Sequence, residues 1–141
     1  MMLMKTVFVL IALAVAAPVA MAAEVPDALV ASTLGVSGVK HTTKVANKYG
    51  VSYSDVTYVD GQGQAMIVIR HADPAQFSLW KQAGGNAIAS VAGVGAEAFQ
   101  YKMIGGVCAR SVTHAACVTD LLGKGVPFSQ AQLLTLLKAA L

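Results

Sequence analysis

The sequence predicts an α+β fold: an antiparallel β-sheet of about four to five strands, with two helices packed on one face and a short N-terminal helix. Between residues 51 and 122, short segments rich in β-branched and aromatic residues alternate in polarity, as half-buried antiparallel strands do. Residues 74–83 and 130–141 instead repeat apolar side chains at helical spacing. Each such helix needs a sheet face to bury its apolar stripe, which completes the predicted architecture.

Residues 1–22 are expected to be a secretory signal peptide. Nineteen of these 22 residues are apolar; Lys5 makes the start positive, and Ala20-Met21-Ala22 ends the segment as a small-residue cleavage site. A membrane anchor is the alternative, but the apolar run from Thr6 to Ala17 is shorter than the ~20 residues that a spanning helix needs. We therefore expect residues 23–141 to form a single α+β domain, exported to the periplasm or secreted, with no membrane span in the mature chain.

Three helices are predicted from residues that start or stop helices. They cover residues 24–37, 74–83 and 130–141. Gly35 ends the first, Asp73 is placed to cap the second with Pro74 at its first position, and Ser129 is placed to cap the third. Residues 38–50 are polar and basic, and are expected to be a second short helix or a surface loop.

Five segments are predicted to be strands because of their alternation and their β-branched or aromatic content. They are residues 51–59, 65–70, 97–103, 107–112 and 116–122. Asp60-Gly61-Gln62-Gly63 joins the first two, since its glycines supply the positive φ of a tight turn. Residues 86–95 are small and apolar, and are expected to be a closely packed connection.

Cys108 and Cys117 are the only cysteines, and they fall near opposite positions of a predicted hairpin. An even number of cysteines in an exported chain favours a disulfide. A redox pair usually has Cys-x-x-Cys spacing. A zinc site that included His114 would lack a fourth ligand nearby in the sequence. We therefore predict a structural disulfide between Cys108 and Cys117.

The order of the predicted elements and one short junction resemble a known family. The junction reads Val91-x-Gly93-Val94-Gly95-x-Glu97-Ala98-Phe99. It resembles a recurrent junction in small exported bacterial proteins of unknown function, related to the DUF3558-type lipoprotein group. The chain departs from that group because it lacks the lipid-attachment cysteine and carries Cys108 and Cys117. The resemblance implies a fold and export, and it implies no activity.

Composition and motifs argue against an enzyme or a nucleic-acid binder. The chain has 10 basic and 7 acidic residues, and without Lys5 the balance is 9 against 7. No G-x-S-x-G motif occurs and the carboxylates are scattered, so neither a serine nucleophile nor a carboxylate pair is indicated. His71-x-Asp73 is the one close His/carboxylate pair, and we interpret it as a strand end that runs into Asp73 as a helix cap. No catalytic residue, metal ligand or cofactor is predicted.

A possible ligand or partner surface is predicted from the charged residues. Its members are Lys40, His41, Lys44, Lys48, His71 and Asp73. The basic ones suit an anionic partner, such as lipid headgroups or an acidic protein surface, or are a solvated helix face. The aromatic residues are expected to build the core, and a concave sheet lined by some of them is the best pocket candidate. They are Tyr49, Tyr53, Tyr58, Phe77, Trp80, Phe99 and Tyr101.

These observations together predict a small, exported, non-enzymatic binding or structural module. A protein partner is one form of this hypothesis, for example an extracytoplasmic hydrolase that the chain inhibits. The alternative is a periplasmic carrier of a small ligand or a metal, which would use His71, Asp73 and a second histidine.

Overall fold

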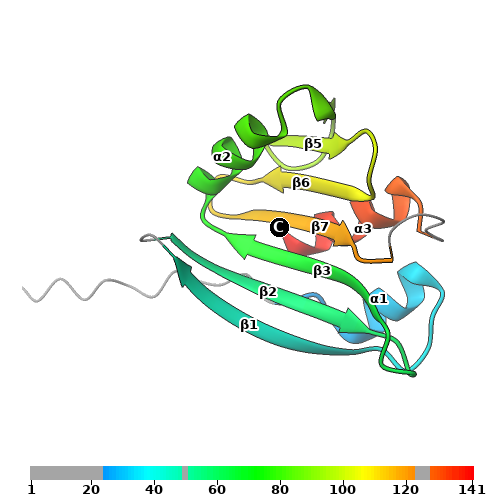
Figure 1. Cartoon of the computed structure of the whole chain (residues 1–141). Coiled ribbons are helices and arrows are strands. Elements are labelled where there is room, and N and C mark those ends of the chain that lie inside the picture. Colours follow the sequence, from blue (N-terminus) through cyan, green and yellow to red (C-terminus); the bar gives the residue numbers. More distant parts are fainter. Residues whose placement is uncertain (1–23, 49–50, 123–127) are drawn as a thin grey trace, which may run out of the picture.

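The structure is a computed structural model that describes residues 24–48, 51–122 and 128–141. Within these residues, seven strands form one antiparallel sheet in the order β1-β2-β3-β7-β6-β5-β4 (Figure 1). The strands are β1 (Lys40–Lys48), β2 (Val51–Val59), β3 (Ala65–Ala72), β4 (Ile88–Val91), β5 (Glu97–Tyr101), β6 (Gly106–Arg110) and β7 (Ala115–Asp120). The helices are α1 (Asp27–Leu34), α2 (Pro74–Gly84) and α3 (Gln130–Ala140). The α+β class is therefore confirmed. The predicted signal peptide, residues 1–22, lies outside the described residues.

The sheet has two more strands than the upper end of the prediction. Residues 38–50 were expected to be a helix or a loop, but β1 pairs with β2 without interruption from Lys40 opposite Val59 to Lys48 opposite Val51. β1 lacks the alternation of apolar and polar residues that identifies a strand, because it lies at the sheet edge and most of its side chains are exposed. Inside the expected connection 86–95, β4 is a four-residue edge strand on β5.

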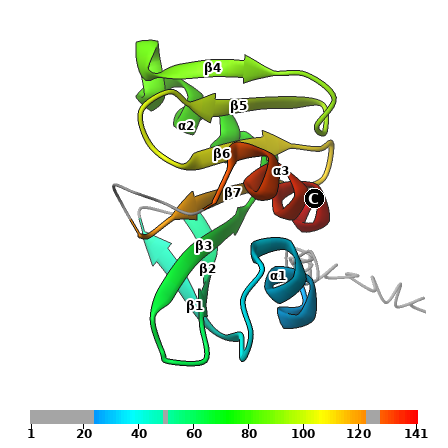
Figure 2. The same ribbon diagram turned by 90° about the vertical axis from the view of Figure 1, so that its right-hand side faces the viewer.

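The two large helices lie on opposite faces of the sheet, so the prediction that they share one face is wrong (Figure 2). On one face, here called the inner face, strand residues such as Val107 and Ala109 pack with Leu133 and Leu136 of α3. On the other, here called the outer face, Cys108 packs with Phe77 of α2. Alternate residues of β6 thus face two different helices. The burial of both faces explains why β6 is apolar at nearly every position.

The inner face is also covered by α1, which is tied to α3. Val30 and Leu34 of α1 belong to the same core cluster as the α3 leucines. Ser129 caps α3, as predicted. The side chain of Gln132 completes this capping box by accepting a hydrogen bond from the Ser129 backbone N–H through Oε1, and it donates through Nε2 to the carbonyl oxygen of Thr33 at 3.0 Å. The predicted stop at Gly35 is confirmed as well, with φ at +69° in the left-handed region.

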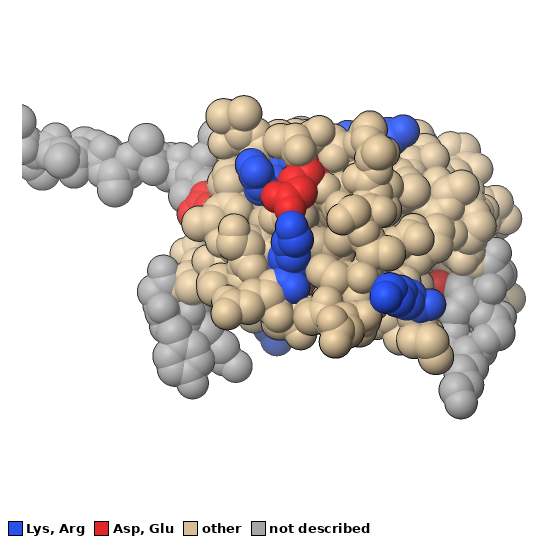
Figure 3. All heavy atoms as spheres, turned by 90° about the horizontal axis from the view of Figure 1, so that it is seen from above, with Lys and Arg blue, Asp and Glu red and all other residues tan. Residues whose placement is uncertain are grey.

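The disulfide between Cys108 and Cys117 is present, and the two cysteines are direct partners across β6 and β7. It lies on the outer face beneath α2. The Lys81 side chain of α2 also binds Glu97 on β5, and Glu97 is 3.4 Å from Arg110 on β6. Figure 3 shows acidic and basic side chains in contact on this side of the molecule, within a largely uncharged surface. These contacts fix α2 over β5, β6 and β7.

On the outer face, α2 packs mainly against β6 and β7. The outer side chains of β1, β2 and β3 are only partly buried or exposed, as in the half-buried Tyr53, Asp55 and Thr57. This half of the sheet therefore has an open outer face, whereas its inner face is buried at β2 and β3. Among the described helices, none is long and apolar enough to cross a membrane.

Candidate functional site

The candidate site is the outer surface of β1, β2 and β3, which we call the open face. Strand register puts directly paired residues on one side of the sheet, and this defines the members of the surface. They are Lys40, Thr42, Lys44, Tyr53, Asp55, Thr57, Val68 and Arg70. The open face is rich in hydroxyl and charged groups, and it continues directly into the region beneath α2.

A charged row crosses the open face. Lys44 is the register partner of Asp55, and Asp55 is the partner of Arg70. Arg70 donates two hydrogen bonds to Asp55, from Nε at 2.8 Å and from Nη2 at 2.9 Å. Its guanidinium also lies 4.1 Å from the centre of the Tyr53 ring. The hydrogen bonds to Asp55 raise the pKa of Arg70 above its usual value, so the guanidinium is charged and held in one orientation.

The net charge of the open face is positive. Asp55 is neutralised by Arg70, while neither Lys40 nor Lys44 takes part in any ion pair formed by the described residues. Both lysines are exposed. Two ammonium groups are therefore available for an acidic partner.

A groove of about 230 Å³ lies where the open face meets α2. It is lined by Asp55, Val68, Arg70, Trp80, Tyr101, Cys108, Cys117 and Thr119. Trp80 and Tyr101 are half-buried, so their rings remain partly accessible at the groove.

The expectation that the aromatic residues are core holds for Tyr58, Phe77 and Phe99, which are buried. Trp80 and Tyr101 are only partly buried, although they pack against the core cluster beneath α2, and Tyr53 belongs to neither core cluster. Tyr49 lies outside the described residues.

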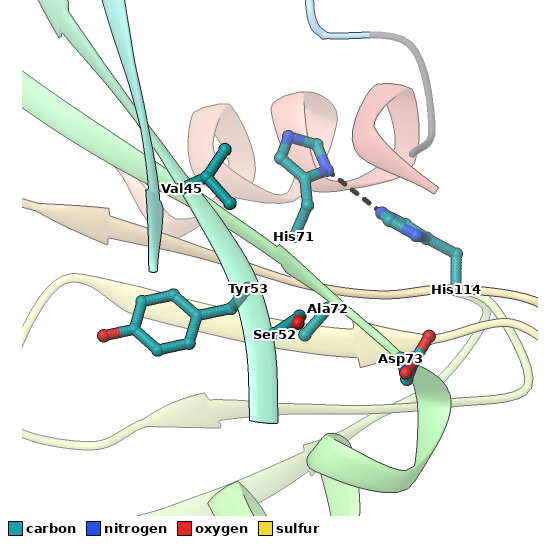
Figure 4. Close-up of a pocket in the computed structure, with 7 residues that line it drawn as sticks. All are labelled: Val45, Ser52, Tyr53, His71, Ala72, Asp73 and His114. Carbon is teal, nitrogen blue, oxygen red and sulfur yellow. Dashed lines mark hydrogen bonds between the residues drawn. The ribbon is translucent and has the colours of Figure 1, made fainter. Parts of the chain in front are cut away.

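A second feature is a pair of histidines on the inner side of the sheet. His71 and His114 are 3% and 4% exposed, and Nδ1 of His71 lies 3.0 Å from Nε2 of His114 (Figure 4). Burial, and then the neighbouring His114, lower the pKa of His71 to about 4, and burial also lowers the pKa of His114. Both imidazoles are therefore neutral at pH 7.

The histidine pair borders a cavity of about 40 Å³. Nε2 of His71 is buried and has no hydrogen-bond partner in the described part of the chain. Asp73 lines the same cavity but is exposed, and its side chain makes no cap hydrogen bond to α2. His71 and Asp73 therefore line one cavity, as their closeness in the sequence suggested. The direct partner of His71 is His114 and not Asp73. Across residues 24–48, 51–122 and 128–141, no group of three or more His, Cys, Asp or Glu side chains is arranged to hold a metal ion.

His41 belongs to a different arrangement from the lysines beside it. Its Nε2 lies 2.8 Å from Glu24 and its Nδ1 lies 2.5 Å from Asp27. The hydrogen bond to Asp27 is the main cause of a raised pKa at His41. Thr43 donates to the same Glu24 at 2.5 Å. This cluster ties β1 to the start of α1, which gives His41 a structural role.

The structure therefore divides the predicted basic cluster. Lys40 and Lys44 lie on the open face, whereas His41 lies on the opposite side of β1; the side chain of Lys48 is outside the described residues. Sequence reasoning missed Asp55 and Arg70, although both predicted strands were correct. The available signal was one charged residue inside each predicted strand. Pairing the two strands as a hairpin would have placed these two residues side by side.

Comparison of the chain with protein-family models, with curated proteins and with solved structures finds no match. The resemblance to the DUF3558-type lipoprotein group accordingly stays a prediction.

Proposed function

We propose that the chain is an exported, non-enzymatic binding module that docks onto an acidic surface of a partner protein through the open face. The observation that carries this proposal is the contrast on one side of a single sheet. Helix α2 covers much of the β5–β7 half, whereas the β1–β3 half presents a fixed Arg70 and two lysines that form no ion pair among the described residues. An aromatic groove lies where the two halves meet. Export is supported by the apolar N-terminal segment and by a disulfide, which persists in oxidising compartments.

The residue types of the open face are those that dominate protein interfaces. Trp, Tyr and Arg are enriched among residues whose truncation costs the most binding energy. Tyr53, Arg70, Trp80 and Tyr101 lie on or beside the open face in the described structure. Arg70 and Tyr53 are already held against each other, which lowers the entropy lost when a partner orders them.

At the open face and at the histidine pair, pocket size favours a protein partner over a small ligand. Pockets for small molecules usually measure about 300–1,000 Å³ and enclose most of the ligand. The groove measures about 230 Å³ and the histidine cavity about 40 Å³. The groove is large enough for one or two side chains that project from a partner surface, with the lysines contacting the surrounding acidic groups.

The proposal is tested by site-specific photocrosslinking in the cell that makes the protein. A benzophenone amino acid replaces Thr42, which is exposed on the open face, and in a matched strain it replaces Thr135, which is exposed on α3. We expect a discrete crosslinked product from position 42, because the partner lies over that strand. Position 135 is expected to give none.

A second pair of strains tests whether the product depends on the groove. Adding Arg70→Ala or Trp80→Ala to the Thr42 probe is expected to reduce the product strongly, while Leu79→Ala on the exposed side of α2 leaves it intact. No product at position 42, equal products at both probe positions, or products insensitive to both groove variants would each contradict the proposal.

A further inference from the structure

Among the described residues, the free edge of β1 is long, regular and not covered by another strand. β1 ends the sheet, and its nine residues pair with β2 in an unbroken register. The other edge strand, β4, has only four residues. Within the described chain, the backbone groups on the far side of β1 have no strand beside them. Such an edge is a template for a further strand.

Proteins usually protect an edge by keeping it short, by a bulge, by a proline or by a covering element. β1 has none of these among the described residues. Its protection is electrostatic, because lysines recur along one side, at Lys40 and Lys44. In an antiparallel pairing of two β1 edges centred on Thr42, Lys40 of each copy would face Lys44 of the other. Like charges directly opposite are unfavourable, so the edge opposes self-association.

The same lysines favour a strand with acidic side chains on the open-face side. Opposite charges across a strand pair stabilise the pairing. The other side of β1 offers a second preference. Val45 is 66% exposed, although it also lines the apolar mouth of the cavity beside His71. An apolar side chain at the neighbouring position of an added strand would cover Val45.

We infer that the partner contributes an extended segment that adds to the sheet along β1, with acidic side chains opposite Lys40 and Lys44 and an apolar side chain beside Val45. This inference rests on the proposed function and names the part of the partner that binds. The added strand would extend the open face by one strand, so the rest of the partner would contact the groove at the same time.

The experiment uses synthetic peptides as the probe and the mature chain as the receptor. The acidic peptide has nine residues with glutamate at alternate positions and valine or threonine between them, and a control peptide has lysine in place of glutamate. Titration to millimolar concentration is followed by backbone NMR, with amide exchange measured across β1. We expect the acidic peptide to bind at least ten-fold more tightly than the lysine peptide. We also expect it to slow exchange of amides in β1 at least ten-fold.

Two further controls separate strand addition from attraction of charge alone. The double variant Lys40→Glu/Lys44→Glu, whose two sites are exposed, is expected to reverse the preference and bind the lysine peptide. An acidic peptide that is N-methylated at alternate residues keeps its charge but loses backbone donors, and it is expected not to bind.

Three results would overturn strand addition: no binding of the acidic peptide at millimolar concentration, equal binding of the methylated peptide, or unchanged exchange in β1. If the Thr42 crosslink still forms in the cell, such a result removes strand addition alone and leaves the open face as the binding surface. If that crosslink is also absent, the proposed function fails with it.

Discussion

The two halves of the outer face share one sheet and differ in what covers them. Beneath α2, β5–β7 present Phe99, Cys108 and Ala115, all buried, to the ring of Phe77. On β1–β3 several matching positions are polar or charged, as at Lys44 and Asp55, beside apolar ones such as Val68. A sheet face that packs against a helix of its own chain is expected to be apolar. The proposed function interprets this difference as an adaptation of the open half to water and to a charged partner.

The largest expected effect lies in the covered half. Phe77 is 1% exposed, and its ring centre lies 5.3 Å from that of Phe99. Phe77→Ala is expected to lower the free energy of unfolding by about 3–5 kcal/mol, since it leaves a cavity under α2. Lys44→Ala, on the exposed part of the open half, is expected to change it by less than about 0.5 kcal/mol. Denaturant unfolding measures both changes. Similar losses of unfolding free energy in the two variants would contradict the proposed contrast between the halves.

Removal of the disulfide is the next largest effect. The double variant Cys108→Ala/Cys117→Ala is expected to lose about 2.5–3 kcal/mol of unfolding free energy, because the reduced chain regains the entropy of a loop of roughly ten residues. The same chemical denaturation measures the loss. In hydrogen exchange, β6 and β7 should lose protection before β1 and β2. A loss spread evenly over all strands would show that the two halves unfold as one unit.

The histidine pair lies near the junction of the halves, since His71 on β3 is the register partner of Ala116 on β7. The pKa of His71 falls to about 4 in the fold, against about 6.5 in an unfolded chain. The unfolded state therefore binds more protons between these values, and stability is complete above about pH 6.5 and declines as pH falls towards 4. Glu24 and Asp55 act against this by raising the pKa of His71, and His114 acts with it.

We expect a loss on the order of 1–3 kcal/mol between pH 7 and pH 4.5 from this source. The measurement is denaturant unfolding across that range, compared with His71→Gln, whose pH dependence is expected to be smaller. His41 gives the opposite sign. Its pKa is raised by Asp27, so its contribution is present at low pH and is lost as pH rises through its folded value. An unchanged pH dependence in His71→Gln would show that the pair does not titrate as described.

Apart from the Lys44→Ala control, the smallest expected effect is at the ion pair of the open face. Arg70 and Asp55 have side chains that are 40% and 26% exposed. Arg70→Lys removes the second hydrogen bond and the contact with Tyr53, and it is expected to cost only about 0.5–1 kcal/mol. Thermal unfolding is sufficient to measure this change. A loss above roughly 2 kcal/mol would place Arg70 among the residues that hold the fold, and the open half would then need a different interpretation.

The sequence was sufficient for the features that depend on local chemistry. The turn at Gly35, the cap at Ser129 and the Cys108–Cys117 disulfide each follow from neighbouring residues. It was insufficient where tertiary contacts decide. β1 carries no apolar alternation and is a strand because β2 pairs with it. The helices α2 and α3 have similar apolar stripes, and only the burial of both faces of β6 shows that they lie on opposite sides.

The candidate site was predictable in part for the same reason. Lys40 and Lys44 were singled out by charge, and the register places both on the open face. The pairing of Asp55 with Arg70 and that of His71 with His114 join segments 15 and 43 residues apart. No local pattern specifies such pairs, because they depend on strand order.

The most direct test of the central claim compares two charge reversals of equal size against the partner captured at Thr42. Lys40→Glu/Lys44→Glu changes the open face, and Lys102→Glu/Lys138→Glu makes the same change in net charge at exposed positions elsewhere. Binding of the purified partner to each variant is measured by calorimetry at physiological salt. The account predicts at least a ten-fold loss of affinity for the first variant and less than a two-fold change for the second. Equal losses in both variants, or none in either, would contradict it.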